Sequence, residues 1–229
     1  MNTWNGDVIN DIQFSITNHC NAACPQCHRT DTNGLGTVDW LPVFSWSLDE
    51  FKTYLPIKEL QKMKIINFCG TWGDPMMAKN IYEICEYIIK NSHCSIIIDT
   101  NGSMRSEEFW WNFGVMCGNR LTVNFAVDGC TQDMHEKYRR KTSLNKVLKN
   151  MEILSSTKAI AKVITIVFKH NENYLDKIKK MCLNYGAEDI QFIESNRFEN
   201  DKFYFTNESG KKEWLERLSA NGRSLVKSL

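Results

Sequence analysis

The sequence lacks three features that would each point to a partner or a compartment: long apolar runs, an excess of one charge, and a secretion signal. No stretch approaches the roughly 18 consecutive apolar residues of a membrane-spanning helix, so we expect no membrane partner. Lys and Arg number 28 and Asp and Glu 27, a balance that argues against nucleic acid as a partner. Residues 1–10 are polar and contain no apolar signal-peptide segment, which predicts a cytoplasmic protein.

The nine cysteines lack a setting for disulfide bonds, because a chain without an export signal is expected in a reducing compartment. Two of them, Cys69 and Cys130, lie near predicted strand ends and are the best outside candidates for a thiol that donates hydrogen. Six are scattered without the spacing of metal ligands, and we expect them to pack as small apolar side chains: Cys69, Cys85, Cys94, Cys117, Cys130 and Cys182.

Internal repeats and low-complexity segments are also missing, and the hydrophobic pattern instead alternates short β-rich runs with amphipathic helical stretches. The predicted strands are Ile12–Thr17, Ile65–Cys69, Ser95–Asp99, Leu121–Val127, Ala161–Phe168 and Asp189–Ile193. The predicted helices are Leu48–Lys62, Asn80–Lys90, Glu107–Cys117, Leu144–Ser155 and Asn173–Tyr185. This alternation predicts an α/β protein with a parallel sheet, either doubly wound or a six-stranded partial barrel. In both architectures ligands bind at the carboxyl ends of the strands.

Local signals refine these elements. Ser47 and Glu50 form a capping-box pattern at the first helix, which we expect Pro56 to end or kink. Gly186 fits the end of the last helix in this series. We expect residues 1–195 to form one domain, and residues 196–229 to be a polar linker and a terminal helix rather than a second domain.

Cys20, Cys24 and Cys27 follow directly after the first predicted strand with the spacing C-x3-C-x2-C. Such a loop gathers three thiolates without help from distant sequence. Four thiolates saturate a [4Fe–4S] cluster, whereas three leave one iron open, and an open position is typical of catalytic metal sites. Two alternatives remain at this point: a zinc site completed by His19 or His28, and a chance grouping of core cysteines.

Three further motifs each follow a predicted strand, although each alone is a common turn or surface pattern. They are Gly70-Thr-Trp-Gly-Asp-Pro75, Asp99-Thr-Asn-Gly102, and Asp128-Gly129 followed by His135 and Arg139. Together with the cysteine loop, their order and placement over residues 12–195 resemble the radical S-adenosylmethionine superfamily. The resemblance implies a partial (β/α)6 barrel with a short helical C-terminal tail, in which Cys20, Cys24 and Cys27 hold the cluster.

The resemblance also implies how the cofactor is held. Asp74 would accept a hydrogen bond from the amino group of the methionine part, and Arg139 would pair with its carboxylate. The serine of the family's fourth-strand motif is Ala126 here, so that contact would move to Asn124 or Asp128. Gln26 replaces an aromatic residue that in the family packs near adenine. The full set of implied cofactor-binding residues is Gly73, Asp74, Thr100, Asn101, Asp128 and Arg139.

The function implied by the resemblance is reductive cleavage of S-adenosylmethionine at a [4Fe–4S] cluster to a 5′-deoxyadenosyl radical, which takes hydrogen from a substrate. The partners would be an electron donor such as a flavodoxin or ferredoxin and a small-molecule or peptide substrate. Modification of a peptide or protein side chain and conversion of a small metabolite or nucleoside both stay open. A binding module that carries an iron–sulfur cluster or zinc is the non-enzyme alternative.

Two expectations concern the surroundings of the site. The strand residues Ile66, Phe68, Ile98 and Phe125 are expected near the site or its walls. The irregular stretch of residues 28–46, which carries Trp40, Phe44 and Trp46, and the tail after Asn196 are the two candidates for a lid. Simple packing of these aromatic residues under a surface loop is the alternative.

Overall fold

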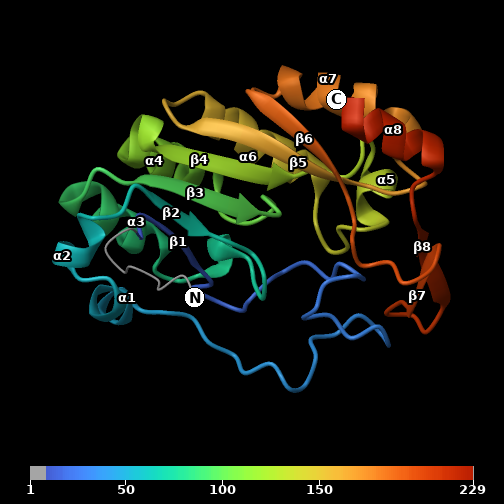
Figure 1. Cartoon of the computed structure of the whole chain (residues 1–229), viewed down its shortest axis with the longest axis horizontal. Coiled ribbons are helices and arrows are strands. Elements are labelled where there is room, and N and C mark those ends of the chain that lie inside the picture. Colours follow the sequence, from blue (N-terminus) through green and yellow to red (C-terminus); the bar gives the residue numbers. More distant parts are fainter. Residues whose placement is uncertain (1–8, 229) are drawn as a thin grey trace, which may run out of the picture.

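Six parallel strands form one sheet in the order β1-β2-β3-β4-β5-β6 (Figure 1). The computed structural model describes residues 9–228, with the side chains of the last helix given as far as Val226. The strands are β1 (Asp11–Phe14), β2 (Ile65–Phe68), β3 (Ser95–Thr100), β4 (Leu121–Ala126), β5 (Ile160–Val167) and β6 (Asp189–Glu194). Consecutive strands are neighbours throughout, so the strand order never reverses as it does in a doubly wound sheet. The prediction of a partial barrel is confirmed.

Helices follow the strands and cover one face of the sheet (Figure 1). They are α1 (Leu48–Tyr54), α2 (Ile57–Leu60), α3 (Ile81–Asn91), α4 (Glu107–Cys117), α5 (Gln132–Glu136), α6 (Leu144–Ser155) and α7 (Leu175–Asn184), with short 3-10 turns η2 (Pro75–Met77), η3 (Gly118–Arg120) and η4 (Glu172–Tyr174). Ser47 and Glu50 form the expected capping box of α1, and Pro56 separates α1 from α2. Gly186 has φ +87° after α7, which fits its expected role as a helix stop.

The main core lies between the sheet and these helices. Ile66, Phe68, Ile98 and Phe125 are completely buried there, and the Phe125 ring lies 5.3 Å from the ring of Trp110 in α4. These four residues were expected near the site or its walls, but their side chains fill the core on the helix side of the sheet. Because side chains alternate along a strand, the residues between them face the opposite, concave side of the sheet.

A long irregular segment joins β1 to α1 and runs past the carboxyl ends of the strands (Figure 1). Its return is fixed to its start by hydrogen bonds from the Trp46 amide to the Ile16 carbonyl (2.9 Å) and from the Phe44 amide to the Asn18 side chain (2.8 Å). Trp46 stacks on Tyr54 at 4.9 Å. Trp40 instead is 63% exposed at the middle of the segment. The two ends of the segment are thus fixed to the domain, while its middle is exposed.

The C-terminal part of the chain contains a hairpin that the sequence analysis missed. An antiparallel pair, β7 (Lys202–Thr206) and β8 (Lys212–Glu216), occupies the predicted linker, and the predicted terminal helix follows as α8 (Ala220–Ser228). The division between residues 1–195 and 196–229 remains a prediction. The inner face of the hairpin carries the buried side chains of Phe205 and Leu215, which join a second apolar cluster with Cys24 and Phe168.

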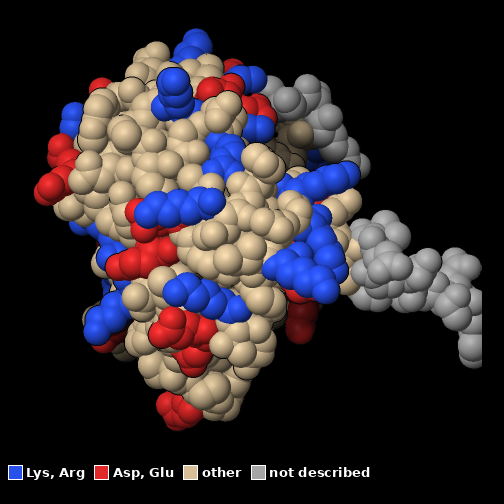
Figure 2. All heavy atoms as spheres, turned by 90° about the vertical axis from the view of Figure 1, so that its left-hand side faces the viewer, with Lys and Arg blue, Asp and Glu red and all other residues tan. Residues whose placement is uncertain are grey.

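Surface charge is mixed. On the face shown in Figure 2, basic and acidic side chains lie next to one another. Within residues 9–228, every helix is too short or too polar to cross a membrane.

Candidate functional site

A cavity of about 330 Å³ lies at the carboxyl ends of the six parallel strands. The segments that follow β1, β2, β3 and β4 all contribute to its wall, and so do residues of β5 and β6. Ile164, Ile166 and Ile193 form an apolar side of the cavity, opposite a polar side built by the predicted motifs. The sheet therefore brings together residues that are more than 100 positions apart in the sequence.

The cysteine loop forms one side of this cavity, and all three predicted cysteines line it. The Cys27 amide donates to the Cys24 carbonyl at 2.9 Å, which closes a turn between these two residues. The Ala23 amide donates to the Arg140 carbonyl at 3.1 Å and ties the loop to the segment after α5. Burial raises the pKa of Cys20 to about 12 and that of Cys24 to about 11. Both thiols must therefore lose a proton when they bind a metal.

This donor set fits a [4Fe–4S] cluster. Three soft thiolates from one loop suit an iron–sulfur cluster and leave one of its irons without a cysteine. Within residues 9–228, no three His, Cys, Asp or Glu side chains are gathered closely enough to hold a single metal ion. In a cluster each thiolate binds a different iron, so its ligands need not converge on one point.

Asp74 connects the motif after β2 to the motif after β3. Its buried carboxylate accepts hydrogen bonds from the Met76 amide (2.9 Å), the Thr100 hydroxyl (2.8 Å), and both the backbone (2.7 Å) and side-chain (2.6 Å) amides of Asn101. Burial raises the pKa of Asp74, while these hydrogen bonds act in the opposite direction. Both carboxylate oxygens thus already accept hydrogen bonds from the protein.

Two glycines, Gly73 and Gly102, allow the segments after β2 and β3 to pack closely against neighbouring parts of the chain. A Cβ on Gly73 would lie 2.4 Å from the Thr17 carbonyl oxygen, so only glycine fits against the start of the cysteine loop. The neighbouring Asp74 amide donates to the His19 carbonyl at 2.7 Å. Gly102 has φ +73° and would meet the Phe125 ring at 2.5 Å if it carried a Cβ. Both glycines serve packing within the chain at these positions.

Asn101 holds the motif after β3 against the cysteine loop. Its side-chain amide also donates to the Asn21 side chain at 2.9 Å and lies 3.8 Å from the Cys20 sulfur. Its side-chain oxygen accepts from the Ser103 hydroxyl at 2.6 Å. Asp74 and Asn101 therefore fix the positions of three segments relative to one another.

Arg139 enters the cavity from the segment after α5, supported by Asp128. Its Nε donates to Asp128 Oδ2 at 2.5 Å, and its Nη1 lies 3.9 Å from the Cys24 sulfur. Burial lowers the pKa of Arg139, but the Asp128 carboxylate and Cys24 raise it more strongly, so the guanidinium stays charged. Asp128 itself is completely buried, accepts from the Ile166 amide (2.6 Å) and does not line the cavity.

His135 stabilises this arrangement as a neutral ring. Burial, together with the charge of Arg139, lowers the pKa of His135 to about 3. Its Nδ1 accepts from the Asp128 amide at 3.2 Å, and its Nε2 lies 3.0 Å from the Thr142 hydroxyl. Because that hydroxyl donates to the Arg139 carbonyl (2.5 Å), the histidine Nε2 is the donor in its own bond. His135 therefore positions both members of the Asp128–Arg139 pair.

The structure gathers eight of the nine predicted site residues around the cavity, and Asp128 lies behind Arg139. Asn124 and Ala126 line it as well. Gln26 is buried and points elsewhere: its side-chain oxygen accepts from the Ser195 hydroxyl at 2.8 Å, which joins the cysteine loop to the segment after β6.

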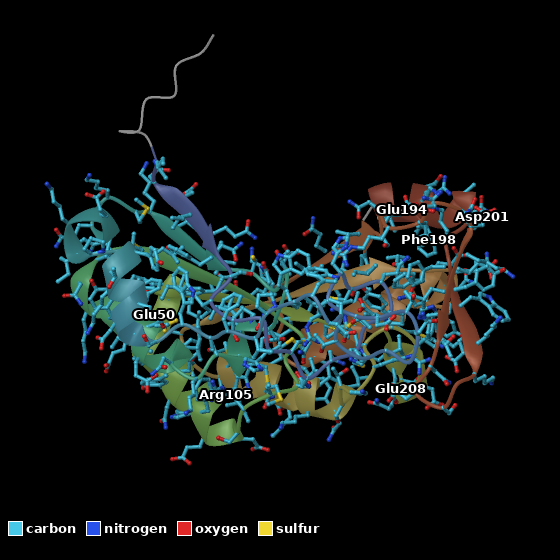
Figure 3. All side chains as sticks on the ribbon, turned by 90° about the horizontal axis from the view of Figure 1, so that it is seen from below. Glu50, Arg105, Glu194, Phe198, Asp201 and Glu208 are labelled. Carbon is cyan, nitrogen blue, oxygen red and sulfur yellow. The ribbon has the colours of Figure 1, made fainter. Side chains whose placement is uncertain are left out.

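Sequence reasoning missed several lining residues, notably Arg29, Tyr138 and the segment from Glu194 to Arg197. Figure 3 shows Glu194 at the end of β6 and Phe198 farther along the segment that follows it. Two features could have indicated these lining residues. Arg29 follows Cys27 by two residues, and β6 ends at the rim of the cavity.

The sequence model of the Radical SAM superfamily matches residues 14–182. The chain belongs to this superfamily. Its members are enzymes that use S-adenosylmethionine and an iron–sulfur cluster.

Individual relatives differ in what they act on. The chain is 26% identical over 187 residues to a cysteine-type anaerobic sulfatase-maturating enzyme of Clostridium novyi, covering 77% of this chain and 48% of the relative. It is also 26% identical over 193 residues to a GTP 3′,8-cyclase of Clostridium perfringens, covering 82% and 56%. The chain thus spans about half the length of the curated relatives it matches.

Among solved structures, SuiB of Streptococcus suis has the same fold. In its complex with S-adenosylmethionine the TM-score is 0.65 at 9% identity, covering 83% of this chain and 42% of SuiB. In its complex with the precursor peptide SuiA the TM-score is 0.63 at 9% identity, covering 81% and 39%.

Proposed function

We propose that this chain binds a [4Fe–4S] cluster through Cys20, Cys24 and Cys27 and uses it to cleave S-adenosylmethionine reductively. The observation that carries the proposal is that these cysteines share one cavity with Asp74, Asn101 and Arg139 at the strand ends. If the cysteines were only a chance grouping of core residues, the other motifs would not be expected to line the same cavity.

The chain's own residues suit the parts of S-adenosylmethionine. The Arg139 guanidinium has five donors, of which Asp128 occupies Nε, so donors remain for the methionine carboxylate. Thr100 and Asn101 present a hydroxyl and an amide where ribose and the amino group would lie. Asp74 holds both of them in place and adds negative charge near the ammonium.

When bound, the cluster would supply the electron for reductive cleavage of S-adenosylmethionine, the chemistry that would provide a radical for taking hydrogen from the substrate. The protein keeps water from the reacting atoms, and Ile164, Ile166 and Ile193 provide an apolar wall for this purpose. The reaction needs an external one-electron donor, for which a flavodoxin or ferredoxin is the expected class.

The substrate belongs to one of two classes, a peptide or protein side chain, or a small metabolite or nucleoside. The relatives support both, because they include a sulfatase-maturating enzyme and a GTP cyclase. The likeness to SuiB with its precursor peptide concerns the fold alone.

Anaerobic reconstitution with iron and sulfide tests the proposal. We expect the wild-type chain to bind one [4Fe–4S] cluster, seen by iron and sulfide analysis and electron paramagnetic resonance after reduction. With dithionite, it should then convert S-adenosylmethionine to 5′-deoxyadenosine and methionine, measured by mass spectrometry. Alanine at Cys20, Cys24 or Cys27 should abolish both.

Cys182→Ala is the matched control, because Cys182 is completely buried in α7 within the main core. This variant should bind the cluster like the wild type. Stoichiometric zinc without iron, or a cluster retained after loss of Cys24, would contradict the proposal.

A further inference from the structure

Arg29 is a buried cation that borders the cavity and has no carboxylate partner among the residues that the structure describes. Only 9% of the residue is exposed. Its Nη1 donates to the Ala22 carbonyl at 3.4 Å and its Nη2 to the Thr37 hydroxyl at 3.1 Å, whereas its Nε is buried and has no partner in the part of the chain that the structure describes. Within residues 9–228, none of the ion pairs involves Arg29.

A buried charge of this kind is costly unless an anion compensates it. The nearby carboxylates of the cavity are already engaged by other groups. Asp74 accepts from Thr100 and Asn101, and Asp99 accepts from Asn124 at 2.7 Å. Asp128 binds Arg139 behind the cavity wall, and Glu194 pairs with Arg217 and Arg223. The compensating anion must therefore come from a bound group.

The position of Arg29 identifies that group. Arg29 follows Cys27 by two residues, and its guanidinium binds the carbonyl of Ala22, which lies between Cys20 and Cys24. A [4Fe–4S] core with three thiolates is anionic, and one-electron reduction adds a further negative charge.

We propose that Arg29 is the fixed counter-charge of the cluster and raises its reduction potential. The inference rests on the proposed cluster. Nearby charge and hydrogen bonds are known to tune the potentials of such clusters. In the reduction step one electron passes from an external one-electron donor to the cluster, while Arg29 keeps its proton and forms no covalent bond. Arg29 is thus a positioning charge rather than a catalytic residue.

Arg139, another cationic group of the cavity, has a different partner, which separates its role from that of Arg29. Arg139 is paired with Asp128 and keeps donors for the methionine carboxylate of S-adenosylmethionine. Arg29 is held within the cysteine loop and keeps its full charge for the cluster.

The test measures the midpoint potential of the reconstituted cluster without S-adenosylmethionine, by a redox titration followed by electron paramagnetic resonance. We expect Arg29→Gln to lower the potential by about 59 mV or more, which corresponds to a tenfold loss in the equilibrium constant for reduction. Arg29→Lys keeps the charge and should lower the potential by less than half as much.

A second pair of variants leaves Arg29 in place. Thr37 is exposed and accepts the Nη2 hydrogen bond of Arg29, so an acidic side chain there fits without burial. Thr37→Asp pairs with Arg29 and should lower the potential in the same direction. Thr37→Asn has nearly the same shape without the charge and should keep the wild-type potential.

The outcomes are separable. Failure of the wild type to bind a [4Fe–4S] cluster would overturn the proposed function and this inference together. A normal cluster whose potential is the same in wild type, Arg29→Gln and Thr37→Asp would overturn the role of Arg29 alone. If Arg29→Gln does not bind the cluster, the role of Arg29 is tested by the difference in midpoint potential between Thr37→Asp and Thr37→Asn. Equal potentials in these two variants would overturn it.

Discussion

At the scale of single residues, the spacing in the sequence predicted that the three cysteines lie together. Burial determined which of the other predicted residues reach the cavity. Cys20, Cys24 and Cys27 are close in sequence, so their pattern alone places them together. Asp128 sits in a motif as clear as that of Asp74, yet it is completely buried behind Arg139. The depth of a side chain depends on tertiary packing, which no local pattern contains. For the same reason Arg29 escaped notice, since an arginine after a metal loop usually faces solvent.

Asp74 provides a prediction at this scale. Asp74→Ala removes the acceptor for three backbone and hydroxyl donors, and hydrogen bonds to a charged group contribute about 1.5–3 kcal/mol each. We expect the dissociation constant for S-adenosylmethionine, measured by calorimetry on the reconstituted protein, to rise at least tenfold.

The control for this variant is Asp176→Ala, which removes an exposed carboxylate from α7. It should bind S-adenosylmethionine like the wild type. An unchanged dissociation constant in Asp74→Ala, with an intact fold, would show that Asp74 does not organise the cofactor site.

At the scale of elements, the parallel strands were predictable and the hairpin was missed. Buried strands such as β2 and β5 are rich in β-branched residues and bounded by turns, so all six predictions are confirmed within a few residues. The outer face of the hairpin strands β7 and β8 combines lysines with the exposed aromatic residues Tyr204 and Trp214, and the segment was interpreted as linker and helix. A signal was present, because Asn207 to Gly210 forms the turn between them and Gly210 has φ +81°.

The loop of residues 28–46 provides a prediction at this scale. Its ends are fixed, but Trp40 is 63% exposed and its ring lies 5.4 Å from Trp72, which is adjacent to the cavity residue Thr71. We expect the middle of the loop to act as the lid. S-adenosylmethionine should therefore slow hydrogen exchange of the backbone around Trp40 in the reconstituted protein, measured by mass spectrometry.

Trp40→Ala should remove most of this protection. Val43→Ala, which changes a side chain that is 73% exposed in the same loop, should retain it. Equal exchange of the loop with and without S-adenosylmethionine would assign the lid to another segment.

At the scale of the whole molecule, the C-terminal hairpin completes the wall around the cysteine loop. Phe205 and Leu215 pack in one apolar cluster with Cys24 and Tyr138. Arg140, whose carbonyl holds the cysteine loop, forms ion pairs with Glu213 and Glu208 of the hairpin. Segments more than 180 residues apart in the sequence thus meet at the cysteine loop, and only the folded chain shows this contact. Predictions from sequence could assign the barrel but not the element that covers its cysteine loop.

Leu215 tests this contribution, because it is 2% exposed whereas its neighbour Trp214 on the outer face is 52% exposed. Leu215→Ala should lower the free energy of unfolding by about 2–5 kcal/mol, the usual range for a buried leucine. Trp214→Ala should lower it by about 1 kcal/mol or less, since it loses mainly an exposed contact with Lys202. Urea titration of the two variants checks both values. Because Leu215 belongs to the same apolar cluster as Cys24, its loss should also speed bleaching of the reconstituted cluster in air, while Trp214→Ala bleaches at the wild-type rate. Equal bleaching rates in both variants would mean that the hairpin stabilises the fold without shielding the cysteine loop.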